Sequence, residues 1–361
     1  MHNPATAARP PRIDLYSDTT TRPSAAMRRA MAEAEVGNEQ AGEDPTVNRL
    51  CAMAAELLGK EAAIFLPSGT MCNEIAYRVW VDHGEEIILD QTSHGLHFET
   101  GGPAALSGAM CRTVAGVRGI FTPEQVAAAV RPKTRHAPRS ALVSLENTAN
   151  LGGGAVWPVE QVRAVAAMAA SHGLRTHMDG ARLLNAVVAS GTPARDYAAP
   201  MDSIWIDLSK GLGCPVGGVL AGSAAFIEQA WRFKHQFGGA MRQAGIIAAA
   251  GVYALTHNIE RLAEDHANAA RLAEAIAEIP GLRLTYDTVP TNMVYFDCAA
   301  TGLTAKEFQA RLTAHDVRIG AQGPTLMRAV THLDVDRAGI EQAIAACRAV
   351  AAEATGRAAA Q

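Results

Sequence analysis

Lys210 stands at the end of a short apolar run and directly before a turn rich in glycine. The run at residues 204–206 has the composition of a buried strand, and the turn contains Gly211 and Gly213. A partly desolvated lysine loses its proton more readily than an exposed one, and the neutral amine can form a Schiff base with a carbonyl group. The glycines would leave space for a flat ligand beside the amine. Because most lysines at strand ends are solvated surface charges, Lys210 needs support from other residues.

Polar residues follow four further strand-like segments. Ser68, Gly69 and Thr70 open a helix after the first of them. Small residues with free N–H groups at a helix N-terminus can bind a phosphate group, although an ordinary N-cap has the same composition. Ligands of open α/β sheets bind beyond the carboxyl ends of the strands, so all these polar groups are candidates for one site. The other three strand-like segments are followed by residues 91–94, which end in His94, by residues 146–148, and by Asp179 with Arg182.

The residue types at these ends predict a particular cofactor. An aspartate at the end of a buried strand needs a cationic partner, and a protonated ring nitrogen is one. A pyridine ring bound by a carboxylate at its nitrogen, by a helix N-terminus at its phosphate and by a lysine at its aldehyde is pyridoxal 5'-phosphate. We therefore expect Lys210 to be the Schiff-base lysine and Asp179 to be the partner of the ring nitrogen.

Strand-like and helix-like segments alternate from about residue 60, which predicts a mostly parallel central sheet with helices on both faces. The expected strands are 62–69, 85–90, 140–147, 174–179 and 203–210, and the expected helices are 70–81, 122–130, 158–173 and 245–279. From about residue 258 the pattern changes to α+β: two short strands within 282–298, a helix from Thr304, a strand at 317–319 and a last helix from Val335. We predict an α/β fold with an N-terminal arm at 1–30, a large cofactor-binding domain at 31–257 and a small C-terminal α+β domain at 258–361.

Composition excludes several classes of function. Of the 361 residues, 48% are hydrophobic and 19% are charged, as in a well-packed enzyme. A net charge of −4 and a pI near 6.3 give no reason to expect nucleic acid or an anionic membrane as a partner. No apolar run approaches the roughly 18 residues that span a bilayer, and residues 1–11 read as a loose arm without a signal-peptide core. The six cysteines form no CxxC pair, which argues against a zinc site or a disulfide framework, so we predict no metal and a cytoplasmic location.

The sequence resembles the L-threonine aldolase family of fold-type I pyridoxal phosphate enzymes, within the β-eliminating lyase group. The resemblance extends from Asp14 to about Asp334, and the paired motifs HMDGAR and LSKGLG…PVG are specific at this spacing. The matching stretches are DLYSDTTTRPSAAM, GNEQAGEDPTVNRL, FLPSGTMCN, SLENT, HMDGARLLNA, LSKGLGCPVGGVL, GGAMRQAG and MRAVTHLDV.

The resemblance implies a role for each matching residue. Lys210 would carry the cofactor, and Asp179 would pair with the pyridinium nitrogen. Either of two histidines would be the base that accepts the proton of the β-hydroxyl group. The phosphate would be bound by Gly69 and Thr70, and by Arg242 of a neighbouring subunit, while His94 would stack on the pyridine ring. Arg182 would lie near the ring hydroxyl and the substrate carboxylate, and that carboxylate would also be bound by Ser17 and Arg328. His136 would lie near the β-hydroxyl group of the substrate.

The sequence departs from the family pattern at three positions. Tyr16 replaces a common arginine, and Cys214 stands where alanine is usual. Neither changes the core of the expected mechanism. A second histidine, His97, follows the stacking histidine closely; a surface or packing role is favoured for it, and an effect on the accepted aldehyde side chain is the alternative.

The implied reaction cleaves L-threonine, L-allo-threonine and related 3-hydroxy amino acids into glycine and an aldehyde, which is acetaldehyde from threonine. A β-eliminating lyase, a dehydratase or an aminotransferase of the same fold is the alternative, because these enzymes share Lys210 and Asp179 and differ at Cβ. A non-catalytic pyridoxal-binding or scaffold protein is disfavoured, since the lysine and the carboxylate-binding groups are present. The resemblance also implies a homotetramer of two dimers with shared active sites, and the apolar stretch 244–255 after Arg242 predicts a buried helix.

Overall fold

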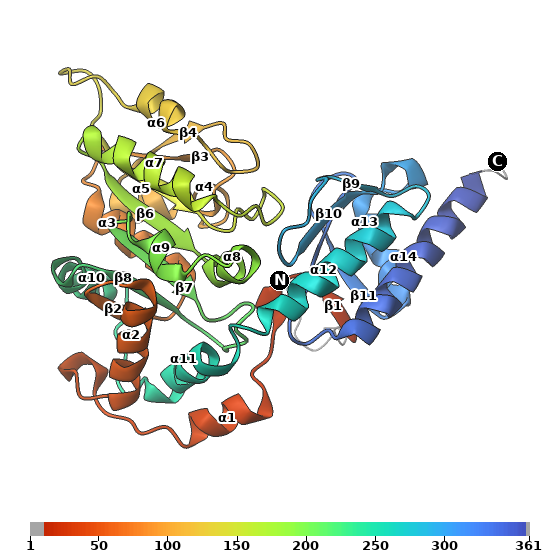
Figure 1. Cartoon of the computed structure of the whole chain (residues 1–361), viewed down its shortest axis with the longest axis horizontal. Coiled ribbons are helices and arrows are strands. Elements are labelled where there is room, and N and C mark those ends of the chain that lie inside the picture. Colours follow the sequence, from red (N-terminus) through yellow and green to blue (C-terminus); the bar gives the residue numbers. More distant parts are fainter. Residues whose placement is uncertain (1–10, 359–361) are drawn as a thin grey trace. The chain divides into compact units, whose positions relative to one another are not determined.

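The computed structural model describes residues 11–358, and side chains as far as residue 356. The chain forms two compact units: Thr21–Ala263, and a smaller one that combines residues 11–20 with 264–358 (Figure 1). The predicted division at residues 30 and 257 stays a prediction, and the first ten residues of its N-terminal arm lie outside the described residues. The described part of that arm is divided between the two units after Thr20. Its strand at Ile13–Leu15 belongs to the smaller unit, where it pairs with Val317–Ala321.

The larger unit is built on a seven-stranded sheet with the order β2-β8-β7-β6-β5-β3-β4. The strands are β2 (Ala62–Leu66), β3 (Glu86–Asp90), β4 (Met110–Val114), β5 (Ser140–Glu146), β6 (Arg175–Gly180), β7 (Ser203–Asp207) and β8 (Gly218–Gly222). Strand β8 is antiparallel to both of its neighbours, and the other six run in one direction. The mostly parallel sheet is therefore confirmed.

Helices cover both faces of this sheet (Figure 1). They are α1 (Ala25–Ala32), α2 (Pro45–Leu58), α3 (Gly69–Trp80), α4 (His94–His97), α5 (Gly102–Ser107), α6 (Pro123–Ala129), α7 (Val159–Ser171), α8 (Leu183–Ser190), α9 (Ala194–Ala198), α10 (Ala224–Gln236) and α11 (Gly245–His257). Helices α3, α5 and α10 pack on one face, and α2, α6 and α7 pack on the other. Among the described residues, no helix combines the length and the apolar composition that a bilayer-spanning segment needs.

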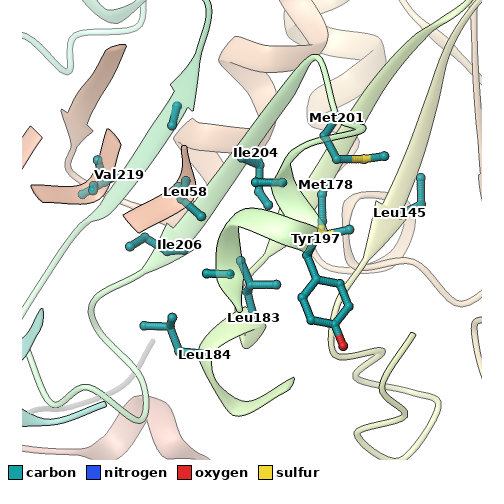
Figure 2. Packing of buried hydrophobic residues seen from close by; sticks show 14 of the residues in the cluster. Leu58, Leu145, Met178, Leu183, Leu184, Tyr197, Met201, Ile204, Ile206 and Val219 are labelled. Atoms are coloured by element: carbon teal, nitrogen blue, oxygen red, sulfur yellow. The ribbon is translucent and has the colours of Figure 1, made fainter. Parts of the chain in front are cut away.

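Strand β7 shows why its sequence is apolar without alternation. Ile204 and Ile206 pack with Leu58 of α2 in the main core, as Figure 2 shows. Trp205, between them, points to the opposite face and packs with Phe226 of α10. Because successive side chains of a strand alternate between faces and both faces are covered, each residue of the run is buried. The strand that ends near Lys210 is thus fixed by packing on both sides.

One sequence-based expectation differs from the structure, and two strands of the seven-stranded sheet were not predicted. The expected helix at 245–279 is interrupted, since α11 ends at His257 and the next helix begins at Leu262. Strand β8 was not predicted, because its sequence GVLAG is poor in the β-branched and aromatic residues that mark a strand. Strand β4 was not predicted either, since its residues lie at the sheet edge and are largely exposed or half-buried.

The smaller unit contains a five-stranded sheet with the order β1-β11-β12-β10-β9. Its elements are β1 (Ile13–Leu15), α12 (Leu262–Ala277), β9 (Arg283–Leu284), β10 (Met293–Asp297), α13 (Ala305–Ala314), β11 (Val317–Ala321), β12 (Leu326–Val330) and α14 (Arg337–Ala358). Residues of α12, α13 and α14 pack with the strands in a separate core. The predicted helix from Thr304 is confirmed, and Thr304 caps it with Glu307 in a capping box.

A buried ion pair in the larger unit holds the segment that contains Arg242. Nζ of Lys234 contacts Oε1 of Glu39, and both side chains are buried. Oε2 of Glu39 accepts a hydrogen bond from the N–H of Met241 at 2.9 Å, and the N–H of Glu39 donates to the carbonyl oxygen of Arg242 at 3.0 Å. The pair therefore fixes the backbone beside Arg242 as well as neutralising two charges.

Replacing Glu39 by alanine should destabilise the protein strongly, because Lys234 would remain buried without its partner. We expect the free energy of unfolding, measured by urea denaturation, to fall by roughly 3–5 kcal/mol. The control is Glu160→Ala, which breaks an exposed pair with Arg163 and should change that free energy by about 0–1 kcal/mol. Equal effects of the two substitutions would contradict the role assigned to the buried pair.

Candidate active site

The carboxyl ends of β6 and β7 bring Asp179 and Lys210 to the same edge of the sheet. The two strands are parallel neighbours, with Asp179 opposite Trp205. Asp179 is 4% exposed, and the side chain of Lys210 is 15% exposed. Nζ of Lys210 lies 5.7 Å from the centre of the Trp205 ring. An acid and an amine thus stand beside a buried aromatic ring, as the strand-end pattern predicted.

Asn73 of α3 connects this acid to its surroundings. Its Nδ2 donates to Oδ2 of Asp179 at 2.8 Å and to Oε1 of Glu99 at 2.7 Å. Its Oδ1 accepts a hydrogen bond from Nε1 of Trp205 at 2.7 Å. Asp179 also accepts the N–H of Ala181 through Oδ1 at 3.0 Å. Because the amide is fully buried and all of its polar atoms are used, it fixes the orientation of both carboxylates.

His177, in β6, also belongs to this hydrogen-bond network. Burial lowers the pKa of His177 to about 4, so the ring is neutral at pH 7. Ser203 accepts the indole N–H of Trp80 at 2.8 Å and lies 2.8 Å from Nδ1 of His177. The Ser203 hydroxyl therefore donates to Nδ1, and Nε2–H of His177 donates to Oδ1 of Asn73 at 3.2 Å. The His177 ring therefore carries its proton on Nε2, and both of its nitrogens have a hydrogen-bond partner while the ring is neutral.

Lys210 has an acidic partner that the sequence analysis did not single out. Nζ donates to Oδ2 of Asp207, the last residue of β7, at 2.6 Å. Oδ1 of the same carboxylate accepts the N–H of Ser209 at 2.7 Å and its hydroxyl at 2.9 Å. Asp207 is 8% exposed, so its charge is compensated by Lys210 and by these two donors. The amine is held in place at the sheet edge rather than free in solvent.

His94 lies next to two acidic groups. The ring atom Nδ1 of His94 is 2.8 Å from Oε1 of Glu99, and the backbone N–H of His94 donates to Oε2 of Glu146 at 2.8 Å. The ligand atoms of His94, Glu99 and Asp179 all lie within 4.8 Å of one another. Burial alone would lower the pKa of His94, but the hydrogen bond to Glu99 and the negative charges of Asp179, Glu99 and Glu146 outweigh it and raise that pKa. The ring-binding roles expected for His94 and Asp179 stay predictions.

The N-terminus of α3 lies at the same edge and is open. Ser68 caps the helix by accepting the N–H of Met71 at 3.2 Å, and both Ser68 and Thr70 are exposed. A Cβ atom on Gly69 would lie 2.2 Å from Cη2 of Trp205, so only glycine fits against this ring. The twelve-residue helix α3 therefore starts with accessible backbone N–H groups beside the Trp205 ring, close to which Lys210 also lies. Such a helix start can bind an anion.

Two buried groups at the end of β5 have no hydrogen-bond partner among the described residues: Nδ2 of Asn147 and Oγ1 of Thr148. Both residues are at most 1% exposed. Buried polar atoms without partners are rare and mark places where a ligand can supply the missing bond. Arg182, at the end of β6, is also buried, and its N–H donates to the carbonyl oxygen of Asn147 at 3.4 Å.

The structure does not bring all of the predicted residues to this edge. His136 is exposed and lies in the loop before β5, at the amino ends of the strands, so a seven-residue strand of about 20 Å separates it from Glu146. Within its own chain, His136 is therefore not near Lys210. The contact with the β-hydroxyl group that is predicted for His136 stays a prediction.

Other predicted residues lie elsewhere on the chain. Arg242 is exposed, between α10 and α11. Ser17 and Arg328 belong to the smaller unit, where Nη2 of Arg328 donates to the carbonyl oxygen of Tyr16 at 3.4 Å. His97 is exposed, and its Nε2 lies 2.6 Å from the carbonyl oxygen of Gln91. The roles predicted for Ser17, Arg242 and Arg328 stay predictions.

The sequence analysis missed Asn73, Glu99, His177 and Asp207 as functional residues. Asn73 and Glu99 do not follow a strand, so the strand-end rule could not find them. Asp207 and His177 lie inside the expected strand segments, and the strand-end rule considers only the residues that follow a strand. A signal was present, since a buried parallel strand with an internal aspartate or histidine needs a polar partner.

An acid beside an open helix N-terminus and an amine at the carboxyl edge of a mostly parallel α/β sheet define the class: a fold-type I pyridoxal phosphate enzyme. Comparisons with known proteins agree with this class. The family model for beta-eliminating lyases matches residues 14–299. The low specificity L-threonine aldolase of Escherichia coli (strain K12) is 43% identical over 338 residues, which cover 93% of this chain and 98% of that protein.

A plant relative and a solved structure extend the agreement. Low-specificity L-threonine aldolase 1 of Arabidopsis thaliana is 40% identical over 325 residues, with 89% of this chain and 91% of that protein covered. The threonine aldolase structure from Leishmania major has a TM-score of 0.81 at 21% identity, covering 94% of this chain and 99% of that one. The chain belongs to the L-threonine aldolase family of beta-eliminating lyases, which confirms the predicted family, fold class and enzyme class.

Replacing Glu99 by glutamine should move the titration of His94 to lower pH, because the charge that favours the protonated ring is lost while burial remains. In the parent protein, the raised pKa adds stability below the ordinary value of 6.5, and this contribution is lost as the pH rises through the raised pKa. NMR of 15N-labelled histidine measures the midpoint. The control is Glu160→Gln, which should leave it unchanged. A midpoint that stays constant in Glu99→Gln would contradict the assigned cause.

Proposed function

We propose that this chain is a pyridoxal phosphate-dependent aldolase that cleaves L-threonine, L-allo-threonine and related 3-hydroxy amino acids into glycine and an aldehyde. The observation that carries the proposal is the pairing of Lys210 and Asp179 at the carboxyl ends of neighbouring parallel strands, beside the open N-terminus of α3. The relatives named above, which are L-threonine aldolases, support the same substrate class. The reaction makes the chain a carbon–carbon lyase.

The residues of the larger unit fit the cofactor. The Asp179 carboxylate is held by two N–H donors and can pair with a protonated ring nitrogen. The missing side chain of Gly69 makes room for the Trp205 ring against the start of α3. Ser68, Gly69 and Thr70 would bind the phosphate group, and Lys210 would hold the cofactor covalently. When bound, pyridoxal phosphate supplies the electron sink for the electron pair of the cleaved Cα–Cβ bond.

The chain's own residues would then bind, orient and handle protons. Arg328 and Ser17 would bind the substrate carboxylate, with Arg328 as a bidentate clamp. Arg182 would lie near the ring hydroxyl and that carboxylate. His94 would stack on the ring and, through Nε2, accept the proton of the β-hydroxyl group directly or through a water. Glu99 supports this task, since it occupies Nδ1 and leaves Nε2 as the second proton site.

Assembly and location are part of the proposal. We infer a homotetramer of two dimers, in which Arg242 reaches the phosphate site of the neighbouring subunit and His136 is available only to another chain. The exposure of Arg242 and the apolar surface of α11, where Ile246 is 50% exposed, support an interface there. The free thiols of all six cysteines suit a reducing cytoplasm.

Incubation of the purified holoenzyme with L-threonine tests the reaction. We expect equimolar glycine and acetaldehyde, measured by amino-acid analysis and by coupled reduction of the aldehyde. Ammonia and a keto acid in their place would point to β-elimination or transamination.

Lys210→Ala should abolish turnover, and Asp179→Asn should lower kcat by orders of magnitude, because the ring loses the anion that keeps it protonated. The control is Asp202→Asn, which should keep the activity because Asp202 precedes the amino end of β7, whereas Lys210 follows its carboxyl end.

Subunit mixing tests the shared site. Inactive Lys210→Ala subunits are mixed with inactive Arg242→Ala subunits under conditions where labelled chains are seen to exchange. If Arg242 acts on the neighbouring subunit, each hybrid dimer has one site with both lesions and one intact site, so part of the activity should return. A mixture that stays inactive after exchange would assign Arg242 to its own chain's site or to none.

A further inference from the structure

Glu74 is a buried carboxyl group to which the proposed reaction gives no task. It follows Asn73 in α3 and is 1% exposed. Among the described residues, no N–H or O–H group donates a hydrogen bond to either of its carboxyl oxygens, and the same holds for Oε2 of Glu99. An ionised carboxylate that is buried without a donor is costly, and two of them side by side would also repel each other. Their charge state therefore has to be explained.

The two carboxyl groups interact directly with each other. The side chain of Glu74 contacts that of Glu99 and packs against Gly102, the first residue of α5. A Cβ atom on Gly102 would lie 2.2 Å from Oε1 of Glu74, so the glycine leaves room for the carboxyl group. The N–H of Gly102 donates to the carbonyl oxygen of Glu99 at 2.8 Å, which closes the turn that presents Glu99 to Glu74.

Glu99 has different surroundings on its other oxygen. Oε1 accepts a hydrogen bond from Asn73 at 2.7 Å and lies 2.8 Å from Nδ1 of His94. These contacts require that Oε1 carries no proton, and a charged carboxylate accepts such hydrogen bonds more strongly than a carboxylic acid does. The oxygen of Glu99 that lacks a donor is thus Oε2.

We propose that Glu74 and Glu99 share one proton: Glu74 is a neutral carboxylic acid that donates a hydrogen bond to Oε2 of Glu99, and Glu99 stays the carboxylate that holds Nδ1 of His94. Glu74 is therefore a positioning residue that acts on His94 through Glu99. The inference deepens the proposed function and rests on it, since His94 is the ring-stacking residue there, but its test needs no turnover.

The electrostatics of the region support this assignment. Burial, and then the charge of Glu99 and the hydrogen bond with it, raise the pKa of Glu74 to about 9. The other titratable groups that face Glu74 are Tyr77 on its own helix and Cys111 on β4, and burial raises the pKa of both. Both are neutral at pH 7, so neither brings a positive charge that would hold Glu74 in its ionised form.

Two substitutions separate the proposed role from simple packing. Glu74→Gln keeps a neutral hydrogen-bond donor of the same shape, whereas Glu74→Leu keeps the volume and removes the donor. In the holoenzyme, the infrared band of a protonated carboxyl group should be present at pH 8, which is above the pKa of about 7 to which burial raises Glu146. The band should fade as the pH rises through about 9 and should be missing at pH 8 in Glu74→Gln. Near pH 4.5, where the unfolded parent also begins to hold this proton, the melting temperature should stay near the parent value in Glu74→Gln and fall by a few degrees in Glu74→Leu.

The titration of His94, followed by NMR, reports on the positioning role. Glu74→Gln should leave the midpoint unchanged. Glu74→Leu should move it to higher pH, because a Glu99 carboxylate that lacks its donor binds the proton of His94 more strongly. A packing residue would not move this midpoint.

Stability against pH gives a third readout. Because Glu74 keeps its proton in the folded protein but not in the unfolded chain, the free energy of unfolding of the parent protein should fall progressively as the pH rises from about 4.5 to about 9. Glu74→Gln has no such loss, so its stability should rise relative to that of the parent over this range.

Three results would overturn the proposal: no protonated-carboxyl band at pH 8, equal destabilisation by glutamine and leucine near pH 4.5, or a His94 midpoint that does not change in Glu74→Leu. Each of them can be observed whether or not the protein cleaves threonine. A protein that passes these tests and releases no glycine would refute the proposed function alone.

Discussion

The side-chain amide of Asn73 holds two carboxylates at once, and the candidate site depends on that interaction. One N–H of the amide goes to Asp179 and the other to Glu99, while the indole of Trp205 and the ring of His177 donate to its oxygen. No other side chain of this size offers two donors and an acceptor with two lone pairs in one plane. Aspartate at this position would place a third negative charge between two others.

The site is therefore a group of buried charges that the fold stabilises in advance. Each acid near the sheet edge has its own donors: backbone N–H groups for Asp179 and Glu146, Lys210 and Ser209 for Asp207. The negative charges that remain make this edge favourable for a cation such as a protonated ring nitrogen. Binding then requires little rearrangement of the protein, because the dipoles already point where the charge will be.

The sequence predicts the parts of this arrangement that follow local rules. Lys210, Asp179 and the start of α3 each come directly after an apolar run, and the carboxyl ends of parallel strands share one edge, so their proximity can be inferred without coordinates. Thr122 and Thr304 likewise mark helix starts by their capping pattern, which depends on near neighbours in the chain.

The remaining parts depend on contacts between distant segments. Asn73 and Glu74 lie inside an amphipathic helix, where sequence periodicity cannot distinguish a polar residue that faces a core from one that faces solvent. Glu99 becomes significant only because a turn places it against α3. Strand β8 lacks the residue types of a strand and is recognised only through its pairing with β2 and β7.

Helix α3 sets a spacing that the rest of the protein cannot adjust. Its first residues, at Gly69, would bind the phosphate group, and Asn73 lies about one turn further on, a rise of about 6 Å along the axis. The proposed contacts would therefore place the phosphate group at one position of this helix and would set the orientation of Asp179, through Asn73, from another. A residue inserted between them would rotate Asn73 by about 100° and turn it away from Asp179. Changes of substrate range can therefore arise in the surrounding loops, whereas the length of this first turn cannot vary.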